Sequence, residues 1–175
     1  MVSRLMAERG QAREGYVIEH PNRQKASSKA TKAVVVVLLL LTAGLTIIIS
    51  YGGWDTLAGA KPVQVAYIAL YLLFAFLVAR WNRGVLPVVS ALSIILLIFA
   101  AVSAPEWFDR DKAGFNQSTI DENILGLLTF ILIPVQGLLI AFAMRGFQQA
   151  WNVEVERPAD GSGYRRTGDA SPQPA

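Results

Sequence analysis

Apolar side chains gather in four long runs between residues 33 and 144, separated by short polar stretches. The first run, Ala33–Ser50, contains no charged residue and as a helix covers about 27 Å, close to the thickness of the hydrocarbon layer of a bilayer. The runs Pro62–Ala79, Val85–Ser103 and Asn123–Met144 have similar or greater length. Buried helices of soluble proteins usually carry roughly 10 to 14 apolar residues. The pattern therefore predicts four transmembrane helices.

Helix-start signals agree with these boundaries. Pro62 opens the second run and Pro87 lies in the first turn of the third, where a missing N–H costs no helical hydrogen bond. Thr119-x-x-Glu122 before the fourth run has the spacing of a capping box. The predicted fold class is an all-α integral membrane protein, a four-helix transmembrane bundle made of two helical hairpins.

Three parts follow from this pattern. A basic arm covers residues 1–32, the transmembrane domain residues 33–150, and a tail residues 151–175. The arm is expected to contain one short helix at Val2–Arg13. The tail from Pro158 is rich in Gly, Pro, Ser and Asp, a composition typical of disordered segments.

The first run also has an alternative interpretation as a cleaved signal peptide, because Ala58-Gly59-Ala60 has the small-residue pattern of a cleavage site. However, its apolar core exceeds the usual length of a signal-peptide core, and 32 residues precede it. An uncleaved membrane anchor is favoured.

Positive charge predicts the orientation. The arm, the link between the second and third runs, and the tail together hold 13 Lys and Arg residues, whereas the opposite side holds Lys61, Arg110 and Lys112. Loops rich in Lys and Arg remain in the cytoplasm. We therefore expect both termini to be cytoplasmic, and the cell (plasma) membrane to be the location.

The outer loop, residues 104–122, is predicted to contain a short helix at the membrane interface. Ser103-x-x-Glu106 would start this helix and Gly114 would end it, with Trp107 and Phe108 directed towards lipid.

Acidic residues in this loop have one alternative interpretation. Asp109-x-Asp111-x-x-Gly114 partly matches a calcium-binding loop, but Ala113 and Ile120 occupy the fifth and twelfth positions, where oxygen ligands are required. A solvated acidic face is favoured, and whether the loop binds a cation stays open.

Groups able to catalyse a reaction are scarce. The predicted spans contain no ionisable side chain, which argues against proton relays, ion-coupled transport and voltage sensing. The chain has no cysteine, and a nucleophilic Ser90 or Ser93 would lack a base within the spans. Phosphate-binding, dinucleotide-binding and haem-ligating motifs are missing as well. We therefore expect no enzymatic activity, no cofactor and no metal.

The fourth run carries the most unusual intramembrane feature. Pro134 removes one helical hydrogen bond, and Gln136 places an amide near the bilayer midplane, where an unpaired amide is costly. Ser90 or Ser93 of the third helix is the expected partner. A structural role as interhelical glue is favoured over a polar pathway beside a kinked helix.

Small residues at four-residue spacing predict the helix contacts. Such residues let helix backbones approach closely in lipid, where no hydrophobic force drives association. The predicted contact residues are Thr42, Thr46 and Ser50 on the first helix, Ala75 and Ala79 on the second, and Gly137 and Ala141 on the fourth.

These features favour a non-catalytic structural or accessory subunit, or a homo-oligomer that acts through helix packing. The alternative is a small channel or carrier for a neutral or weakly polar solute. Expected partners are another protein or a second copy, and anionic lipid headgroups at Lys25, Lys29 and Lys32. A nucleic-acid partner is not expected, because no aromatic residues interleave with the basic ones.

Overall fold

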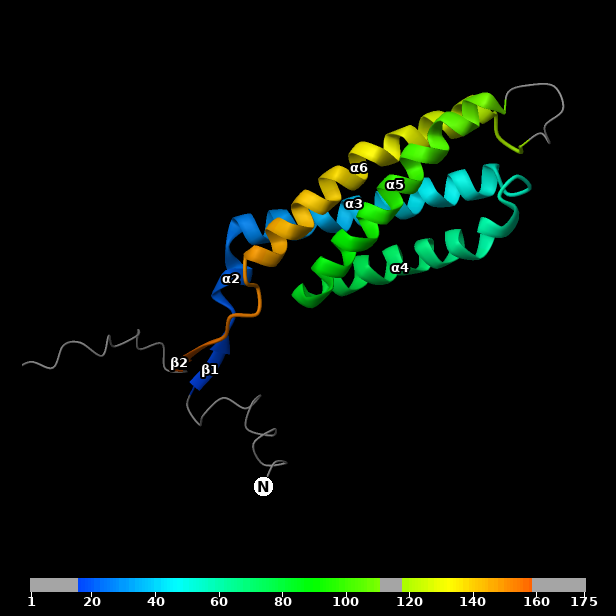
Figure 1. Ribbon diagram of the computed structural model, residues 1–175. Coiled ribbons are helices and arrows are strands. Elements are labelled where there is room, and N and C mark those ends of the chain that lie inside the picture. The colour runs from blue at the N-terminus through cyan, green and yellow to red at the C-terminus, as the bar shows by residue number, and fades with distance from the viewer. Residues whose placement is uncertain (1–15, 111–117, 159–175) are drawn as a thin grey trace, which may run out of the picture.

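The computed structural model describes residues 16–110 and 118–158, in which four long helices form one bundle (Figure 1). All four are long and apolar enough to cross a membrane, which confirms the predicted fold class. The helices are α3 (Ala26–Gly52), α4 (Lys61–Ala79), α5 (Leu86–Asp109) and α6 (Glu122–Gln148). Pro62 and Pro87 lie in the first turns of α4 and α5, as predicted.

Short elements connect and flank these helices. Two strands form an antiparallel pair that joins the segment before the first long helix to the segment after the last. The elements are β1 (Tyr16–Glu19), α2 (Pro21–Gln24), η2 (Ala58–Ala60), η3 (Arg83–Val85) and β2 (Val155–Pro158).

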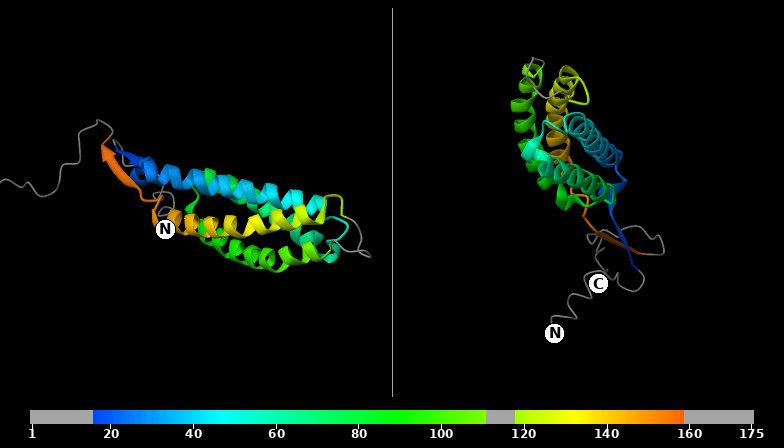
Figure 2. Two further views of the ribbon diagram at one scale, coloured as in Figure 1. Left: turned by 90° about the horizontal axis from the view of Figure 1, so that it is seen from above. Right: turned by 90° about the vertical axis from the view of Figure 1, so that its right-hand side faces the viewer.

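The bundle is open on one side. Helix α3 packs between α4 and α6, and α5 packs along α6, whereas α4 and α5 contact each other only sparsely. Helices α4 and α5 meet at the link 80–85 and diverge towards their other ends (Figure 1). We call the end with the link and the two strands the arm end, and the opposite end the loop end. Figure 2 shows both described termini leaving from the arm end.

Large apolar side chains lie both in the interior and on the surface of this bundle, whereas several polar side chains of the helices lie inside. Large apolar side chains cover the outside, with Phe130 60% and Val102 62% exposed. Polar Thr42, Ser93 and Gln136 are completely buried. This distribution is the one expected where lipid surrounds the bundle and the interior supplies hydrogen bonds.

The helices at the arm end are longer than the apolar runs. Helix α3 begins at Ala26, before the predicted start at Ala33, because its first two turns consist of polar helix-compatible residues. With 27 residues it extends about 40 Å, enough to reach through the headgroup layer. In the tail, β2 ends at Pro158, the residue from which composition predicts disorder. The predicted helix at Val2–Arg13 and the tail beyond Pro158 lie outside the described residues.

At the loop end, the structure departs from the predicted interfacial helix. Helix α5 continues without a break through Pro105 to Asp109. The first half of the predicted interfacial helix is therefore the end of α5 and not a separate element. Trp107 is only 6% exposed, and the prediction that it faces lipid is wrong. The reason is Gly53, where an added Cβ would collide with the Trp107 ring. The remainder of the predicted helix, residues 111–117, lies outside the described residues.

The start of α6 is capped, but not by Thr119 as predicted. Asp121 is the N-cap residue and accepts a hydrogen bond from the Asn123 N–H at 2.9 Å. Glu122 accepts from the backbone N–H and the hydroxyl of Ser118, at 3.0 and 2.8 Å. The Thr119 N–H donates instead to the Gly52 carbonyl at 2.8 Å. This bond fastens the segment before α6 to the end of α3.

At the arm end, Trp151 closes the bundle. It is fully buried, although it follows the last helix, and it meets Trp81 of the link edge-on with ring centroids 5.4 Å apart. Gly146 leaves room for the Trp151 ring, since an added Cβ would lie 3.1 Å from it. The indole N–H donates to Gln149 at 3.0 Å. The beginning of the tail is therefore part of the core.

Replacing Trp151 with Ala should lower the free energy of unfolding by about 3–5 kcal/mol, because a large buried side chain leaves a cavity. The matched control is Trp54→Ala, since Trp54 is 42% exposed at the loop end. Thermal or denaturant unfolding in detergent measures both changes. Equal, small effects of the two substitutions would contradict the role given to Trp151.

Candidate functional site

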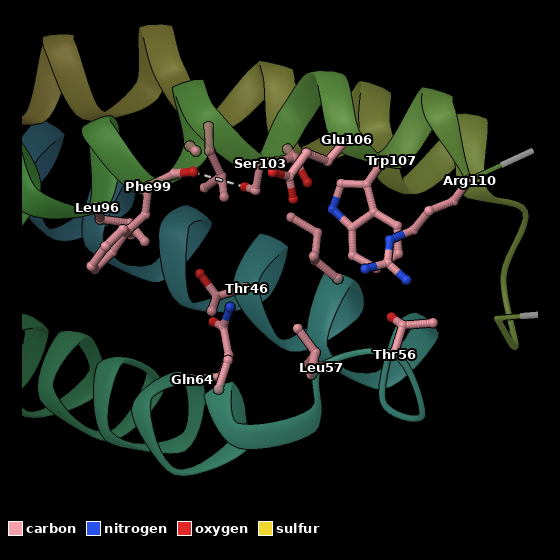
Figure 3. A pocket seen from close by; sticks show the side chains of 15 residues that line it. Thr46, Thr56, Leu57, Gln64, Leu96, Phe99, Ser103, Glu106, Trp107 and Arg110 are labelled. Carbon is pink, nitrogen blue, oxygen red and sulfur yellow. Dashed lines mark hydrogen bonds between the residues drawn. The ribbon is translucent and has the colours of Figure 1, made fainter. Parts of the chain in front are cut away.

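A cleft lies between α4 and α5 towards the loop end (Figure 3). Its volume is about 220 Å³, and it lies where the two helices diverge. Along α5 it runs from Arg110 to Leu96, a helical distance of about 20 Å. Its floor comes from α3 and α6 through Thr46, Ile49, Thr129 and Leu132. The cleft thus leads from the loop end deep into the bundle.

The walls of the cleft combine apolar and polar groups. Leu57, Leu96 and Phe99 supply apolar surface, while Gln64 extends from α4 towards Thr46 (Figure 3). Nearer the loop end lie an exposed carboxylate, a cation and an indole, from Glu106, Arg110 and Trp107. The Arg110 guanidinium lies 5.8 Å from the centroid of the Trp107 ring. An apolar chain that carries hydrogen-bonding groups fits this surface.

A second polar site lies in the interior, around Gln136. Its amide nitrogen donates to the Thr42 hydroxyl at 2.9 Å, and its carbonyl oxygen accepts from the Tyr71 hydroxyl at 3.0 Å. The Tyr71 and Ser93 hydroxyls lie 3.3 Å apart. All four residues are almost completely buried. We call Thr42, Tyr71, Ser93 and Gln136 the midplane cluster; each comes from a different long helix.

The predicted intramembrane residues are only partly brought together. Ser93 reaches Gln136 through Tyr71, whereas the buried Ser90 hydroxyl has no hydrogen-bond partner among the described residues. Pro134 is exposed on the outside of α6, which continues through it. Tyr71 was not among the predicted residues, because a tyrosine within an apolar run looks like part of the hydrophobic pattern.

The predicted contact residues divide into two groups. Thr42, Thr46, Ser50 and Ala75 are buried inside the bundle. The others face outward: Ala79, Gly137 and Ala141 are exposed. At Gly137 an added Cβ would meet nothing within 4 Å. Gly137 therefore makes no close helix contact within the described chain, whereas the Ala79 carbonyl accepts a hydrogen bond from Lys32 of α3.

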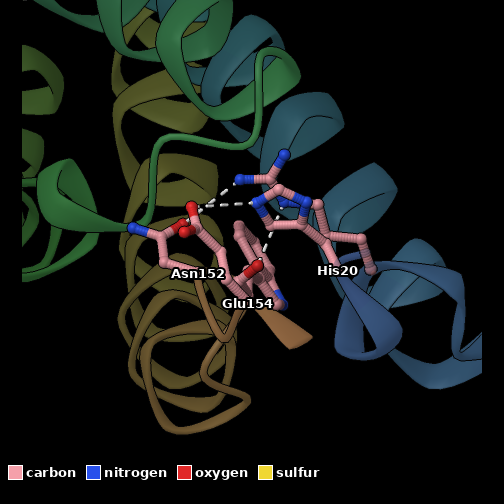
Figure 4. A network of polar contacts seen from close by, with 5 residues as sticks. His20, Asn152 and Glu154 are labelled. Atoms are coloured by element: carbon pink, nitrogen blue, oxygen red, sulfur yellow. Dashed lines mark hydrogen bonds and ion pairs between the residues drawn. The ribbon is translucent and has the colours of Figure 1, made fainter. Parts of the chain in front are cut away.

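At the arm end, polar contacts connect the segment before α3 to the segment after α6. His20 faces Glu154 at 3.4 Å, beside Asn152 (Figure 4), and Arg157 pairs with Glu19 at 3.0 Å. These contacts continue the pairing of β1 with β2 towards the membrane helices.

The lysines predicted to meet lipid headgroups differ in their surroundings. Lys25 and Lys29 are exposed. Lys32 donates to the Ala79 carbonyl at 3.0 Å and lies 4.1 Å from the centroid of the Trp81 ring. Lys32 thereby joins the start of the first long helix to the end of the second.

Carboxylates in the described residues are confined to the two ends of the bundle. Within the four helices they occur only in the turns at the loop end, as Glu106, Asp109 and Glu122. Of these, Glu106 lines the cleft. The described residues contain no group of three or more metal-ligating side chains. Carboxylate chemistry at the cleft would therefore act from its loop end.

Comparison with protein families gives one result. Residues 11–152, which include all four helices, match the family model described as signal-peptide peptidase, presenilin aspartyl protease. No curated protein and no solved structure matches significantly. The family match overturns the expectation that the chain is not an enzyme. This activity was not predicted, because the spans predicted from the sequence contain no ionisable group.

The midplane cluster generates a prediction about stability. A double-mutant cycle of Gln136→Leu and Tyr71→Phe should give a coupling free energy of about 0.6 kcal/mol, and at most about 1.7, the range measured for hydrogen bonds between membrane helices. Unfolding in mixed micelles measures it. Gly137→Ala, on the exposed face beside Gln136, is the control and should be nearly neutral. Additive effects of the two cluster substitutions would rule out the coupling.

Proposed function

Because this chain belongs to the signal-peptide peptidase and presenilin family of aspartyl proteases, we propose that it acts in the hydrolysis of hydrophobic peptides at the membrane. The peptide would lie in the cleft between α4 and α5. The observation that carries this proposal is the coincidence of a family match across all four helices with a cleft of mixed polarity between two of them.

The shape of the bundle supports this use of the cleft. Since α4 and α5 diverge towards the loop end, a peptide can approach from the loop end or sideways from lipid (Figure 1). Side chains such as Leu57 and Phe99 suit an apolar peptide, while the polar groups of the cleft suit its backbone. Signal peptides, named in the family description, have an apolar core of this kind.

Hydrolysis by an aspartyl protease uses two carboxyl groups that share a proton, one to activate water and one to protonate the substrate. Glu106 lines the cleft, and Asp109 follows one helical turn later. Residues three apart on a helix have Cβ atoms about 5–6 Å apart, so their side chains can converge. Glu106 and Asp109 are our candidates for the acid pair of this chain.

A second candidate function is that of a substrate-holding subunit in a protease assembly, with a partner chain supplying the acid pair. Two observations favour it. The described helices have no carboxylate away from the loop end, and Gly137 and Ala141 on the outside of α6 allow another helix to approach closely. The channel or carrier alternative has less support, because both polar atoms of Gln136 are engaged in hydrogen bonds within the bundle.

We further propose that the arm end faces the cytoplasm and that the protein resides in the cell membrane. The distribution of Lys and Arg supports this orientation. The cleft would then open on the outer side.

Orientation is testable because the chain contains no cysteine. Single cysteines at Ser3, Ser118 and Ser171 should react differently with an impermeant maleimide added to intact cells. We expect labelling only at Ser118, the position at the loop end. Labelling at Ser3 or Ser171 in intact cells would contradict the proposed orientation, and labelling of all three after permeabilisation is the control.

Hydrolysis is testable with the purified chain in liposomes and a fluorogenic signal-peptide-like probe. We expect cleavage, and a loss of at least about 100-fold in rate for Glu106→Gln, because general acid–base groups contribute about that factor or more. Glu154→Gln, an exposed carboxylate at the arm end, is the matched control and should retain the rate. Cleavage that requires a co-purified partner would favour the second candidate. Absence of both cleavage and probe binding would refute both.

A further inference from the structure

Two cations meet at the arm end, where α3 begins and α4 ends. Lys32 of α3 donates to the Ala79 carbonyl at 3.0 Å and lies over the Trp81 ring, 4.1 Å from its centroid. Arg80, the residue after Ala79, is exposed, and its guanidinium lies 5.5 Å from the centroid of the Phe76 ring. Two positive charges from neighbouring helices are thus held at the last turn of α4.

The described residues supply no counterion for these two charges. No described carboxylate side chain pairs with Lys32 or Arg80. Neither α3, nor α4, nor the link that follows α4 contains Asp or Glu. Lys32 has three N–H donors, of which the Ala79 carbonyl uses one. Arg80 adds a planar set of donors whose geometry matches phosphate. The surface therefore suits an anion that carries several acceptor oxygens.

An apolar face of α4 continues from Arg80 towards the centre of the bilayer. Leu72, Phe76 and Arg80 are spaced by four residues, so they follow one face of the helix. Leu72 is 45% exposed and Phe76 is 56% exposed. In a membrane this face meets acyl chains, whereas Arg80 at the helix end lies where headgroups begin. A charged end above an apolar face matches the two parts of a phospholipid.

We infer that Lys32 and Arg80 bind the phosphate of an anionic phospholipid, whose acyl chains pack against Leu72 and Phe76. Anionic lipids are enriched in the cytoplasmic leaflet, the side proposed for the arm end. Zwitterionic lipids also carry a phosphate, but their ammonium group is repelled by the two cations. The site therefore selects lipids with a net negative charge, and it is independent of the proposed hydrolysis.

Lys25 distinguishes this site from a general attraction between basic residues and the membrane. It is exposed and precedes Lys32 by seven residues, which is about 10 Å along the helix axis. At about 0.1 M salt this distance equals the screening length. A general attraction would depend on every charge of the arm, whereas the site depends on the two charges at the end of α4.

The test is native mass spectrometry of the full chain in a neutral detergent, titrated with phosphatidylglycerol. Phosphatidylcholine with the same acyl chains is the reference lipid. We expect the first phosphatidylglycerol molecule to bind more tightly than phosphatidylcholine. Arg80→Gln and Lys32→Gln should each weaken its binding about fivefold, the factor that one cation near the membrane surface contributes.

Two other lysines provide matched controls. Lys61 also lies over a tryptophan ring, 5.0 Å from the Trp54 centroid, but at the loop end. Lys61→Gln therefore removes the same charge and should leave the binding of phosphatidylglycerol unchanged. Lys25→Gln should weaken it by less than about twofold. Lys32→Gln also removes a bond between α3 and α4; where this variant fails to fold, the exposed Arg80 decides alone.

Equal affinity for the two lipids would overturn the inference. Equal weakening by Arg80→Gln, Lys25→Gln and Lys61→Gln would also overturn it, because charge alone would then explain the binding. An excess of glycerol phosphate should not displace the lipid, since it has no acyl chains; displacement would overturn the role of Leu72 and Phe76. Each of these results leaves the proposed function standing, because cleavage of the probe peptide is measured separately.

Discussion

Hydrogen bonds around Gln136 are the interaction on which the rest of the bundle depends. Lipid offers no partner to an amide, so Gln136 must find its partners inside the protein. It does so through Thr42 of α3 and Tyr71 of α4, and Tyr71 in turn reaches Ser93 of α5. One residue of α6 is thereby linked to all three other long helices. Because large apolar side chains lie both on the surface and in the interior, this link specifies which faces turn inward.

The midplane cluster divides the bundle into two parts with different properties. Towards the arm end, Lys32, the link and Trp151 connect the helices. Towards the loop end, α4 and α5 diverge, and the connection runs instead from the Gly52 carbonyl to the segment before α6. The cleft lies in this second part. A bundle closed at one end and joined at its middle can hold a ligand at the other end while retaining its fold.

Apolar patterning predicted the four helices, because runs that are long enough to cross a bilayer and carry no charged side chain have few alternatives to a transmembrane helix. It also selected Gln136, since an amide in an apolar run is conspicuous. It did not predict Tyr71 as a partner, because a hydropathy scale does not show whether an aromatic side chain uses a polar group.

Trp107 was expected to face lipid for the same reason, although its ring packs in the space beside Gly53. The cleft depends on how α4 diverges from α5, which is a property of packing and not of either helix alone. Family membership was likewise not predictable from motifs, because the spans predicted from the sequence contain no carboxylate.

Burial of Trp151 has a consequence for the biogenesis of the protein. This residue is synthesised after all four spans, and it fills the space beside Gly146 and Leu86. A nascent chain can insert every helix and still lack the ring that closes the arm end. The beginning of the tail is therefore needed to complete the core, and a chain truncated before Trp151 would leave the apolar surface beside Leu86 uncovered, the kind of surface that chaperones and quality-control proteases detect.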